Sequence, residues 1–170
     1  MSDRWPRYFF IASVLHGLAI ALWSFLFILD GVGITLNLSR IIAGGGVGTW
    51  FTLGYLLYLV TGFVGMAIQG TIYYIAPRLS GKELYSEKLA TAHFVLMNIA
   101  IVCVTWMLGI AGYQGGTLTL ADRVNEIHPR IVVYVQPIGY CIIIGTLAAL
   151  LGGINILMTL KSNSIEQHLS

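Results

Sequence analysis

Four long apolar segments, separated by shorter polar stretches, dominate the pattern of this chain. A helix needs about twenty predominantly apolar residues to cross the roughly 30 Å hydrocarbon core of a bilayer. Four stretches meet this requirement, and we expect transmembrane helices over residues 8–29, 50–76, 89–111 and 131–160. The pattern therefore predicts an all-α membrane protein with four transmembrane helices, in a single membrane domain over residues 1–170.

Composition supports the membrane assignment. Of the 170 residues, 57% are hydrophobic and only 9% are charged, against about 25% charged residues in soluble domains. The mean hydropathy is +0.83. A net charge of +2 is too small to indicate a nucleic-acid partner. Cys103 and Cys141 both fall inside apolar runs, which favours buried thiols over a disulfide.

The N-terminal segment is predicted to remain as the first membrane helix. Two arginines precede an apolar run of about twenty residues, which is longer than the core of a signal peptide, and no small-residue cleavage pattern follows it. Pro6 suits the first turn of this helix, and Asp3 is placed to cap it.

Lysine and arginine are divided unequally between the two predicted sides of the membrane. One side carries six basic residues, which are Arg4, Arg7, Arg78, Lys82, Lys88 and Lys161, and the other side carries Arg40, Arg123 and Arg130. Cytoplasmic loops carry the excess of basic residues. We therefore predict an integral protein of a prokaryotic-type cytoplasmic membrane with both termini in the cytoplasm.

The two loops on the opposite side have different predicted roles. Residues 44–48 read Gly-Gly-Gly-Val-Gly, but a phosphate cradle would need a preceding strand and a lysine, so we expect a flexible loop. Residues 120–127 contain Asp122, Arg123 and Glu126, and they are expected to form a short interfacial helix before His128 and Pro129 begin the last span.

Each predicted span also carries small and polar residues at helical spacing. Small residues let helix backbones approach closely, and lone amides hydrogen-bond across the contact. We interpret these stripes as packing seams. Their members are Ser13, His16, Gly17, Ala21 and Ser24; Gly54, Thr61, Gly65 and Gln69; Asn98, Thr105, Gly109 and Gly112; and Gly145, Ala149, Gly152 and Asn155.

An ordered series of motifs surrounds and follows the hinge between the second and third spans. It comprises Gly62-Phe63-Val64, residues 73–81 (Tyr-Tyr-Ile-Ala-Pro-Arg-Leu-Ser-Gly), residues 84–89, His93-Phe94, residues 109–112, residues 115–119, His128-Pro129, Tyr134 and Asn155. This series resembles the last part of subunit I of heme–copper oxidases, and most closely the C-type (cbb-type) oxygen reductases and their nitric oxide reductase relatives. The resemblance covers about residues 50–160 and implies a fragment of that helical bundle, matching the last three of its twelve helices.

The resemblance also implies where the chemistry of the family would lie. In that family the helix before the hinge carries a His-x-His pair that binds the irons of two hemes. Counted back from Pro77 with the family spacing, these positions fall on Tyr55 and Leu57. Leucine has no donor atom, tyrosine would be an unusual replacement for imidazole, and residues 50–76 contain no histidine. The copper ligands of the family belong to earlier helices.

Two histidines remain as candidate cofactor ligands. His16 lies deep in the first span, where ionisable residues are costly and mark candidate functional sites. His93 lies about one turn inside the third span, and at 1.5 Å per residue the predicted depths of the two rings differ by about 6 Å. A heme b held between them is one hypothesis, and hydrogen bonds to neighbouring helices are the other. His128 and His168 lie outside the spans, and no catalytic or metal-binding motif is present.

These observations predict an accessory membrane subunit of a respiratory or related electron-transfer complex, without redox chemistry or a cofactor of its own. Its partners would be larger membrane subunits and lipid, with quinone as a further option. Two alternatives stay open. One is a small b-type cytochrome or quinol-linked anchor that uses His16 and His93, and the other is a working part of a terminal oxidase or nitric oxide reductase.

Overall fold

The computed structural model describes residues 4–34 and 36–161, and every regular element in them is helical. Four helical runs are long and apolar enough to cross a membrane, at Arg4–Gly31, Gly46–Ser80, Glu87–Leu120 and Val124–Lys161. The all-α fold with four membrane-spanning helices is thus confirmed. Asp3, the expected cap, and His168 lie outside the described residues.

The elements follow one another in a simple order. They are α1 (Arg4–Gly31), α2 (Leu38–Ala43), η1 (Gly46–Gly48), α3 (Thr49–Leu57), η2 (Tyr58–Gly65), α4 (Met66–Ser80), α5 (Glu87–Leu120), η3 (Val124–Glu126) and α6 (Ile127–Lys161). The second span is continuous through α3, η2 and α4, although η2 is a π-helix.

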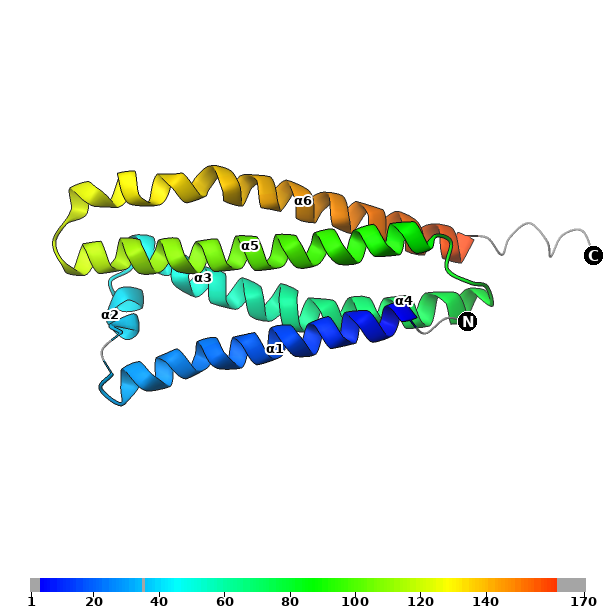
Figure 1. The fold of residues 1–170 in the computed structure, drawn as a ribbon, viewed down its shortest axis with the longest axis horizontal. Helices are drawn as coiled ribbons and strands as arrows, with labels where there is room; N and C mark the ends of the chain where they lie inside the picture. Colours follow the sequence, from blue (N-terminus) through cyan, green and yellow to red (C-terminus); the bar gives the residue numbers. More distant parts are fainter. Residues whose placement is uncertain (1–3, 35, 162–170) are drawn as a thin grey trace, which may run out of the picture.

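The spans run antiparallel to one another (Figure 1). The beginning of α1, the hinge after α4 and the end of α6 meet at one end of the bundle, which we name the basic end because it holds Arg4, Arg78 and Lys161. The other end, which we name the loop end, holds α2, η1 and η3. Near the loop end α1 diverges from α5, and α2 lies between them (Figure 1).

The expected short helix over residues 120–127 is reduced to the three-residue 3-10 helix η3. Instead α5 continues to Leu120, a turn follows in which Asp122 has φ 56°, and η3 leads directly into α6. The polar end of α5 stays helical because it packs against the first loop. A Cβ added to Gly115 would lie 2.4 Å from Cγ1 of Val47, and one added to Gly116 would lie 2.3 Å from Cγ2 of Ile41.

The glycine-rich run after α2 forms a defined turn that ends in η1. Gly45 and Gly46 have φ values of +66° and +54°, which glycine adopts without strain. A Cβ on Gly48 would lie 2.1 Å from the carbonyl oxygen of Ile41, so α2 folds closely over η1. Asp30 fixes the start of α2, since its Oδ2 accepts hydrogen bonds from the backbone N–H and hydroxyl of Ser39, at 3.0 and 2.9 Å.

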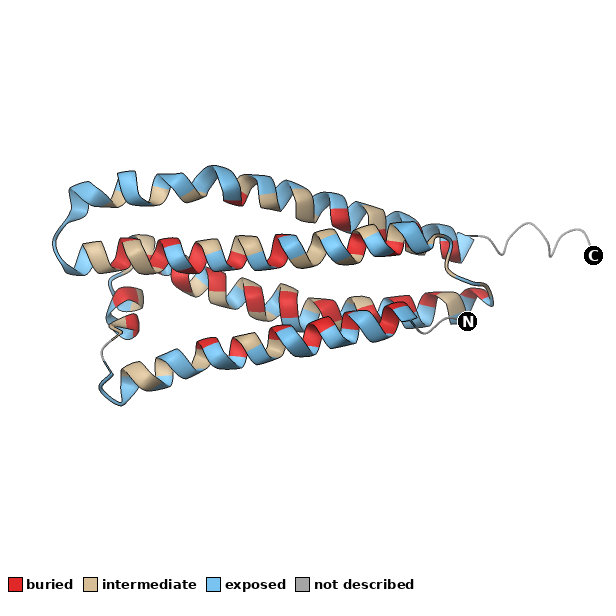
Figure 2. Cartoon of the chain, in the orientation of Figure 1, coloured by how far each residue is buried: buried red, intermediate tan, exposed pale blue. Residues whose placement is uncertain are grey.

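Glycines form a close contact between α3 and α5. A Cβ on Gly112 would lie 2.1 Å from the backbone nitrogen of Phe51, and one on Gly54 would lie 2.6 Å from the carbonyl oxygen of Thr105. The predicted seam through Thr105, Gly109 and Gly112 is therefore a packing surface. Buried positions lie along the inner faces, whereas α6 exposes most of its surface (Figure 2). Cys103 and Cys141 are free and partly buried.

Candidate functional site

A buried histidine, His16, lies in the interior of the bundle on the face of α1 that contacts the second span and α5. It is 6% exposed. Its Nδ1 lies 3.0 Å from the hydroxyl of Tyr58, the first residue of η2, and its Nε2 lies 3.0 Å from Oδ1 of Asn98 on α5. Both ring nitrogens thus have partners, and the three helices are joined at one point.

The orientation of Asn98 assigns the hydrogens in this group. Its Nδ2 donates to the carbonyl oxygen of Phe94 at 2.6 Å, so its Oδ1 faces His16 as an acceptor. In the neutral ring Nε2 then carries the hydrogen, and Nδ1 accepts from the hydroxyl of Tyr58. The group is fully satisfied within the protein.

The π-helix η2 places this group. A π-helix has a wider turn than an α-helix and is often found at functional sites. Gly62 gives the space, because a Cβ there would lie 3.2 Å from Cγ of His16 and 3.1 Å from the Tyr58 ring. Ser13, one turn from His16, donates to the carbonyl oxygen of Phe63 at 2.7 Å. Thus α1 is hydrogen-bonded to the π segment as well as packed against it.

Aromatic rings continue from this group toward the loop end. The Tyr58 ring makes an edge contact with His16 at 5.2 Å between centroids and packs beside Trp23 and Trp106 at 6.2 and 6.4 Å. One turn farther along, the hydroxyl of Tyr55 lies 2.9 Å from that of Ser24.

His93 occupies a separate environment nearer the basic end. Its Nδ1 lies 3.0 Å from the hydroxyl of Tyr73 on α4. Phe9 stacks on Tyr73 at 5.0 Å between centroids and lies 5.3 Å from the imidazole. On the α6 side, a Cβ on Gly152 would lie 2.2 Å from Nδ1 of His93. The ring is therefore enclosed by α1, α4 and α6.

The structure does not bring His16 and His93 together. Phe9, which lies beside His93, precedes His16 by seven residues on α1, which corresponds to about 10 Å along the helix axis. This separation exceeds the 6 Å expected from the sequence. Two imidazoles that ligate one iron must face each other across it, and both nitrogens of His16 are already hydrogen-bonded. The two rings thus have separate partners in this arrangement, and heme ligation by His16 and His93 stays a prediction.

Other polar residues tie the hinge to α6 at the basic end. Asn155 is fully buried. It accepts from the backbone N–H of Ser86 at 2.9 Å and donates to the Ser86 carbonyl at 3.0 Å. Thr159 accepts from the backbone N–H of Tyr85 at 3.1 Å. The indole N–H of Trp5 donates to Glu87, which joins α1 to the start of α5.

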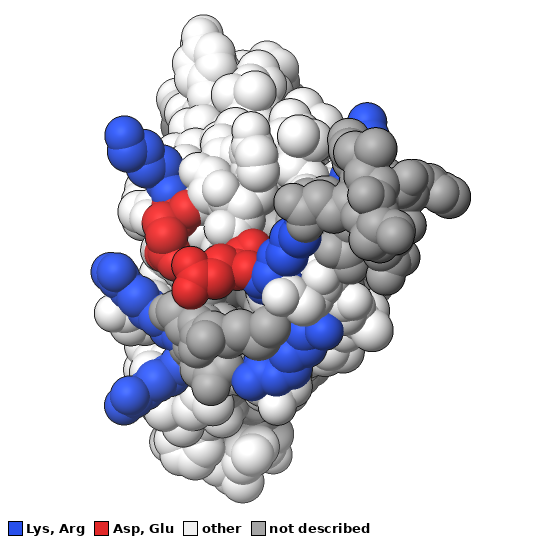
Figure 3. Space-filling model, turned by 90° about the vertical axis from the view of Figure 1, so that its right-hand side faces the viewer, with Lys and Arg blue, Asp and Glu red and all other residues white. Residues whose placement is uncertain are grey.

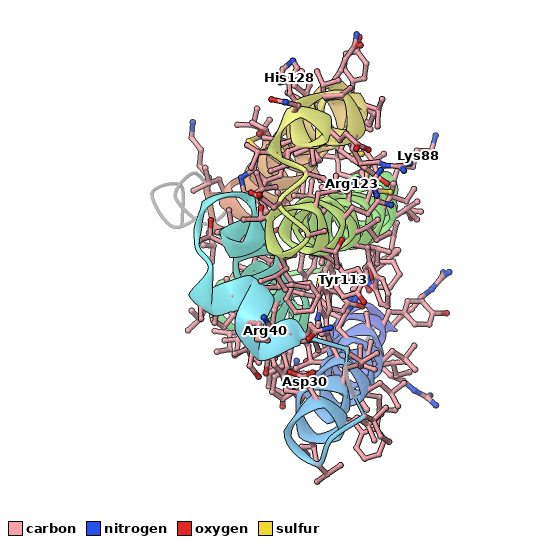
Figure 4. All side chains as sticks on the ribbon, turned by 90° about the vertical axis from the view of Figure 1, so that its left-hand side faces the viewer. Asp30, Arg40, Lys88, Tyr113, Arg123 and His128 are labelled. Atoms are coloured by element: carbon pink, nitrogen blue, oxygen red, sulfur yellow. The ribbon has the colours of Figure 1, made fainter. Side chains whose placement is uncertain are left out.

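Charge is distributed differently at the two ends. Lysine and arginine surround a small acidic group at the basic end (Figure 3). The loop end carries Asp30, Arg40, Arg123 and His128 at its surface (Figure 4). There Arg123 forms an ion pair with Glu126, with Nη2 2.5 Å from Oε2, and this bond raises the pKa of the guanidinium above its usual value. Within residues 4–34 and 36–161, no group of three or more His, Cys, Asp or Glu side chains could hold a metal ion.

Comparison with known proteins identifies the family. The family model of cytochrome c and quinol oxidase polypeptide I matches residues 13–148. The chain belongs to this family. It is 37% identical over 67 residues to a cytochrome c oxidase subunit 1 homolog of Agrobacterium tumefaciens (strain T37), and 35% identical over 71 residues to cytochrome c oxidase subunit 1 of Rhodobacter capsulatus. No solved structure matches the chain.

These matches are partial on both sides. They cover 39% and 41% of this chain, but only 12% and 13% of the two relatives. The resemblance to subunit I of heme–copper oxidases is therefore confirmed as a family relationship, and the matched part of the chain spans about an eighth of the length of these relatives.

Tyr55 and Leu57, the two positions that the resemblance predicts to match heme ligands, have other contacts in this fold. Tyr55 is bonded to Ser24 across the contact with α1, and Leu57 is the last residue of α3, with a partly exposed apolar side chain. His128 lies at the exposed loop end (Figure 4).

The hydroxyl partners of the two buried histidines were not predicted from the sequence. Tyr58 and Tyr73 are 3% exposed, and a tyrosine deep inside an apolar run is the one sequence signal that pointed to them, because a buried phenol needs a hydrogen-bond partner. The aromatic cluster around Trp23 and Trp106 was likewise not anticipated.

Proposed function

We propose that this chain is an accessory, non-catalytic membrane subunit of a respiratory or related electron-transfer complex, built on the scaffold of oxidase polypeptide I. The observation that carries the proposal is the loss of imidazole in the second span. Residues 50–76 contain no histidine, and Tyr55 and Leu57 stand where the resemblance predicts the heme ligands. Tyr55 is hydrogen-bonded to Ser24 of α1.

The surroundings of the two buried histidines, His16 and His93, also support a non-catalytic role. His16 uses both ring nitrogens to join three helices, and His93 is enclosed between an aromatic pair and α6. Each ring acts as a fixed interior hydrogen-bonding group, which is the arrangement expected of buried polar residues that specify helix packing.

The proposal places the chain in a prokaryotic-type cytoplasmic membrane, with the basic end in the cytoplasm, and gives it larger membrane subunits as partners. The unequal distribution of lysine and arginine supports the orientation. Large apolar side chains remain exposed along every span of the described chain, and in a bilayer such surface is covered by lipid or by helices of another subunit.

The test is purification of the full-length tagged chain from its native membrane. We expect larger membrane subunits to co-purify, and we expect the chain separated from them to show no heme absorption between about 400 and 600 nm. A stoichiometric heme on the separated chain would overturn the proposal, and so would purification as a single polypeptide that lacks any membrane partner.

The b-type cytochrome hypothesis makes the opposite prediction about His16. If His16 were a heme ligand, His16→Leu would remove heme from the complex and change its spectrum. If it is a packing residue, the assembled complex keeps its heme content, and His128→Leu at the loop surface serves as the matched control. Full heme loss in the first variant with retention in the second would favour the cytochrome.

A further inference from the structure

Two thiols meet at the contact between α5 and α6. Cys103 lies on α5 and Cys141 on α6, and the two helices run antiparallel side by side (Figure 1). Both cysteines are free and partly buried, and the thiol of Cys141 has that of Cys103 as a hydrogen-bonding partner. The structure thus joins two cysteines from different spans into one dithiol.

The packing of the neighbouring turns gives the same pairing independently. A Cβ added to Gly152 would lie 2.2 Å from Nδ1 of His93, and one added to Gly145 would lie 3.2 Å from Cβ of Ala100. Between these two contacts α5 advances by seven residues and α6 goes back by seven, which is the register of an antiparallel pair. One turn farther along, three residues on α5 and four on α6, this register brings the two cysteines to one level.

The depth of the pair in the membrane determines which reagents reach it. Cys103 has sixteen residues of α5 before it and seventeen after it, which places it about 24 Å along the axis from either end. Water is scarce at that depth of a bilayer. The adjacent side chains of Val102 and Ile142 are 39% and 54% exposed, so the surface beside the pair faces lipid. A reagent therefore reaches the thiols through the hydrocarbon.

Two adjacent thiols undergo an oxidation that a single thiol cannot complete. A sulfenic acid formed on one cysteine condenses with a neighbouring thiol to a disulfide. Such a bond needs Cα atoms about 4.4–6.8 Å apart. Small residues one turn away, Ala100 and Gly145, bring the two backbones close, so the short cysteine side chains can span the contact.

We infer that Cys103 and Cys141 form one oxidisable dithiol, which a membrane-soluble organic hydroperoxide converts to a disulfide between α5 and α6. One sulfur attacks the terminal oxygen of the hydroperoxide, the O–O bond breaks, and the alcohol leaves with the proton of that thiol. The second sulfur then displaces the hydroxyl group of the sulfenic acid, which leaves as water with the second thiol proton. The two sulfurs lose two electrons, and the peroxide gains them.

The disulfide would fix α6 to the rest of the bundle. Among the four spans of the described chain, α6 is the least buried, and the two thiols lie near the middle of its contact with α5. A covalent link there restricts separation of the two helices, and a dithiol reductant removes it by thiol–disulfide exchange. We therefore expect a higher thermal midpoint in the oxidised form, which falls again on reduction.

The experiment uses the full-length chain in liposomes of saturated phosphatidylcholine, which supply no lipid peroxide of their own. Cumene hydroperoxide is the probe, and hydrogen peroxide is the water-soluble comparison. After treatment, N-ethylmaleimide blocks the remaining thiols and the intact mass is measured. We expect cumene hydroperoxide to consume both thiols with the loss of two hydrogen atoms, without joining two chains, and dithiothreitol to restore them. Hydrogen peroxide at equal concentration should act more slowly.

Three variants test whether the two thiols react as a pair. Cys103→Ser and Cys141→Ser each leave one thiol and should form no disulfide within the chain. The matched control, Cys103→Ser combined with Val102→Cys, keeps two thiols at the same depth but turns one by about 100° around α5. We expect it to close the internal disulfide at least about ten-fold more slowly, because the two sulfurs are no longer held together. Circular dichroism checks that each variant folds.

Three results would overturn the inference. The original chain could keep both thiols or lose them to disulfides between chains, which would show that the pair does not close. The shifted control could close as fast as the original chain, or hydrogen peroxide could act as fast as cumene hydroperoxide. None of these outcomes depends on the proposed function, because they concern the chain without any partner subunit.

Discussion

At the scale of single residues, the interior of this protein is organised by two imidazole–phenol pairs. His16 pairs with Tyr58 and His93 with Tyr73, each at 3.0 Å. Ionisable residues in a membrane interior usually pair with one another or face the inside of the bundle, because exposing them to lipid costs free energy. Each pair joins two different helices. The two histidines, which the sequence marks as candidate ligands, are therefore also specific contacts between helices.

The first prediction concerns His16. His16→Leu removes the bonds to Tyr58 and Asn98 and leaves a buried phenol and amide without their partner. Interhelical hydrogen bonds in membranes contribute about 0.6 kcal/mol on average and up to about 1.7, so we expect a loss of about 1–3 kcal/mol in the free energy of unfolding. Unfolding in mixed micelles, followed by circular dichroism, measures it. Equal stability of His16→Leu and the exposed control His128→Leu would contradict this.

The second prediction concerns the contact between α3 and α5. A Cβ on Gly112 would lie 2.1 Å from the backbone nitrogen of Phe51, and backbone cannot move aside as a side chain can. Gly112→Ala should therefore separate the helices and cost about 1–3 kcal/mol. Gly153→Ala is the control, because nothing lies within 4 Å of its added Cβ. The thermal midpoint should fall for Gly112→Ala alone, and a fall of the same size in both variants would refute the close contact.

At the scale of elements, α6 holds the hinge in place through Asn155, whose amide hydrogen-bonds to both the backbone N–H and the carbonyl oxygen of Ser86. We predict that Asn155→Leu, which removes both, raises the rate of amide hydrogen exchange at Ser86 and the first turn of α5 about ten-fold, as expected for a loss near 1.4 kcal/mol. The exposed amide of Gln136, also on α6, bonds only within its own helix. Gln136→Leu should leave exchange at the hinge unchanged, and a matching rise there would point to a general loosening of α6.

The elements show how far sequence reasoning extends. The seam through Gly54, Gly109 and Gly112 could be predicted because small residues at helical spacing have one physical use in a membrane helix. The end of α5 could not, since Gly115 and Gly116 look like a loop until Val47 and Ile41 pack against them. Helix length there is set by tertiary contact and not by local propensity.

The π-helix is one reason why the partners of His16 could not be predicted from the sequence. The apolar run through η2 gives no signal of a wider turn, yet that turn changes which side chains face α1 and α5. The depths of His16 and His93 were predicted by counting residues along ideal helices. Their partners depend on the rotation and relative shift of packed helices, which counting residues cannot supply.

At the scale of the whole molecule, four spans and the arrangement of their ends follow from the apolar segments and short connections. Both described ends of the chain and the hinge meet at the basic end (Figure 1), as an even number of antiparallel spans requires. The fold does not determine which end of the bundle faces the cytoplasm, because the same fold can be inserted in either orientation. The orientation depends on charge, and six of the nine lysines and arginines belong to the basic end.

We therefore predict that the basic end faces the cytoplasm. A green fluorescent protein fused after Ser170 should fluoresce, because it folds on the cytoplasmic side, and alkaline phosphatase fused there should be inactive. The same reporters fused to a chain cut after Arg123, in the turn between α5 and η3, should give the reverse result. As a matched test of the cause, replacing Arg78, Lys82 and Lys88 with glutamine leaves three basic residues on each side. If charge sets the direction, this variant loses its uniform orientation and gives both signals, whereas unchanged reporter activity would show that the orientation is fixed by other features of the helices.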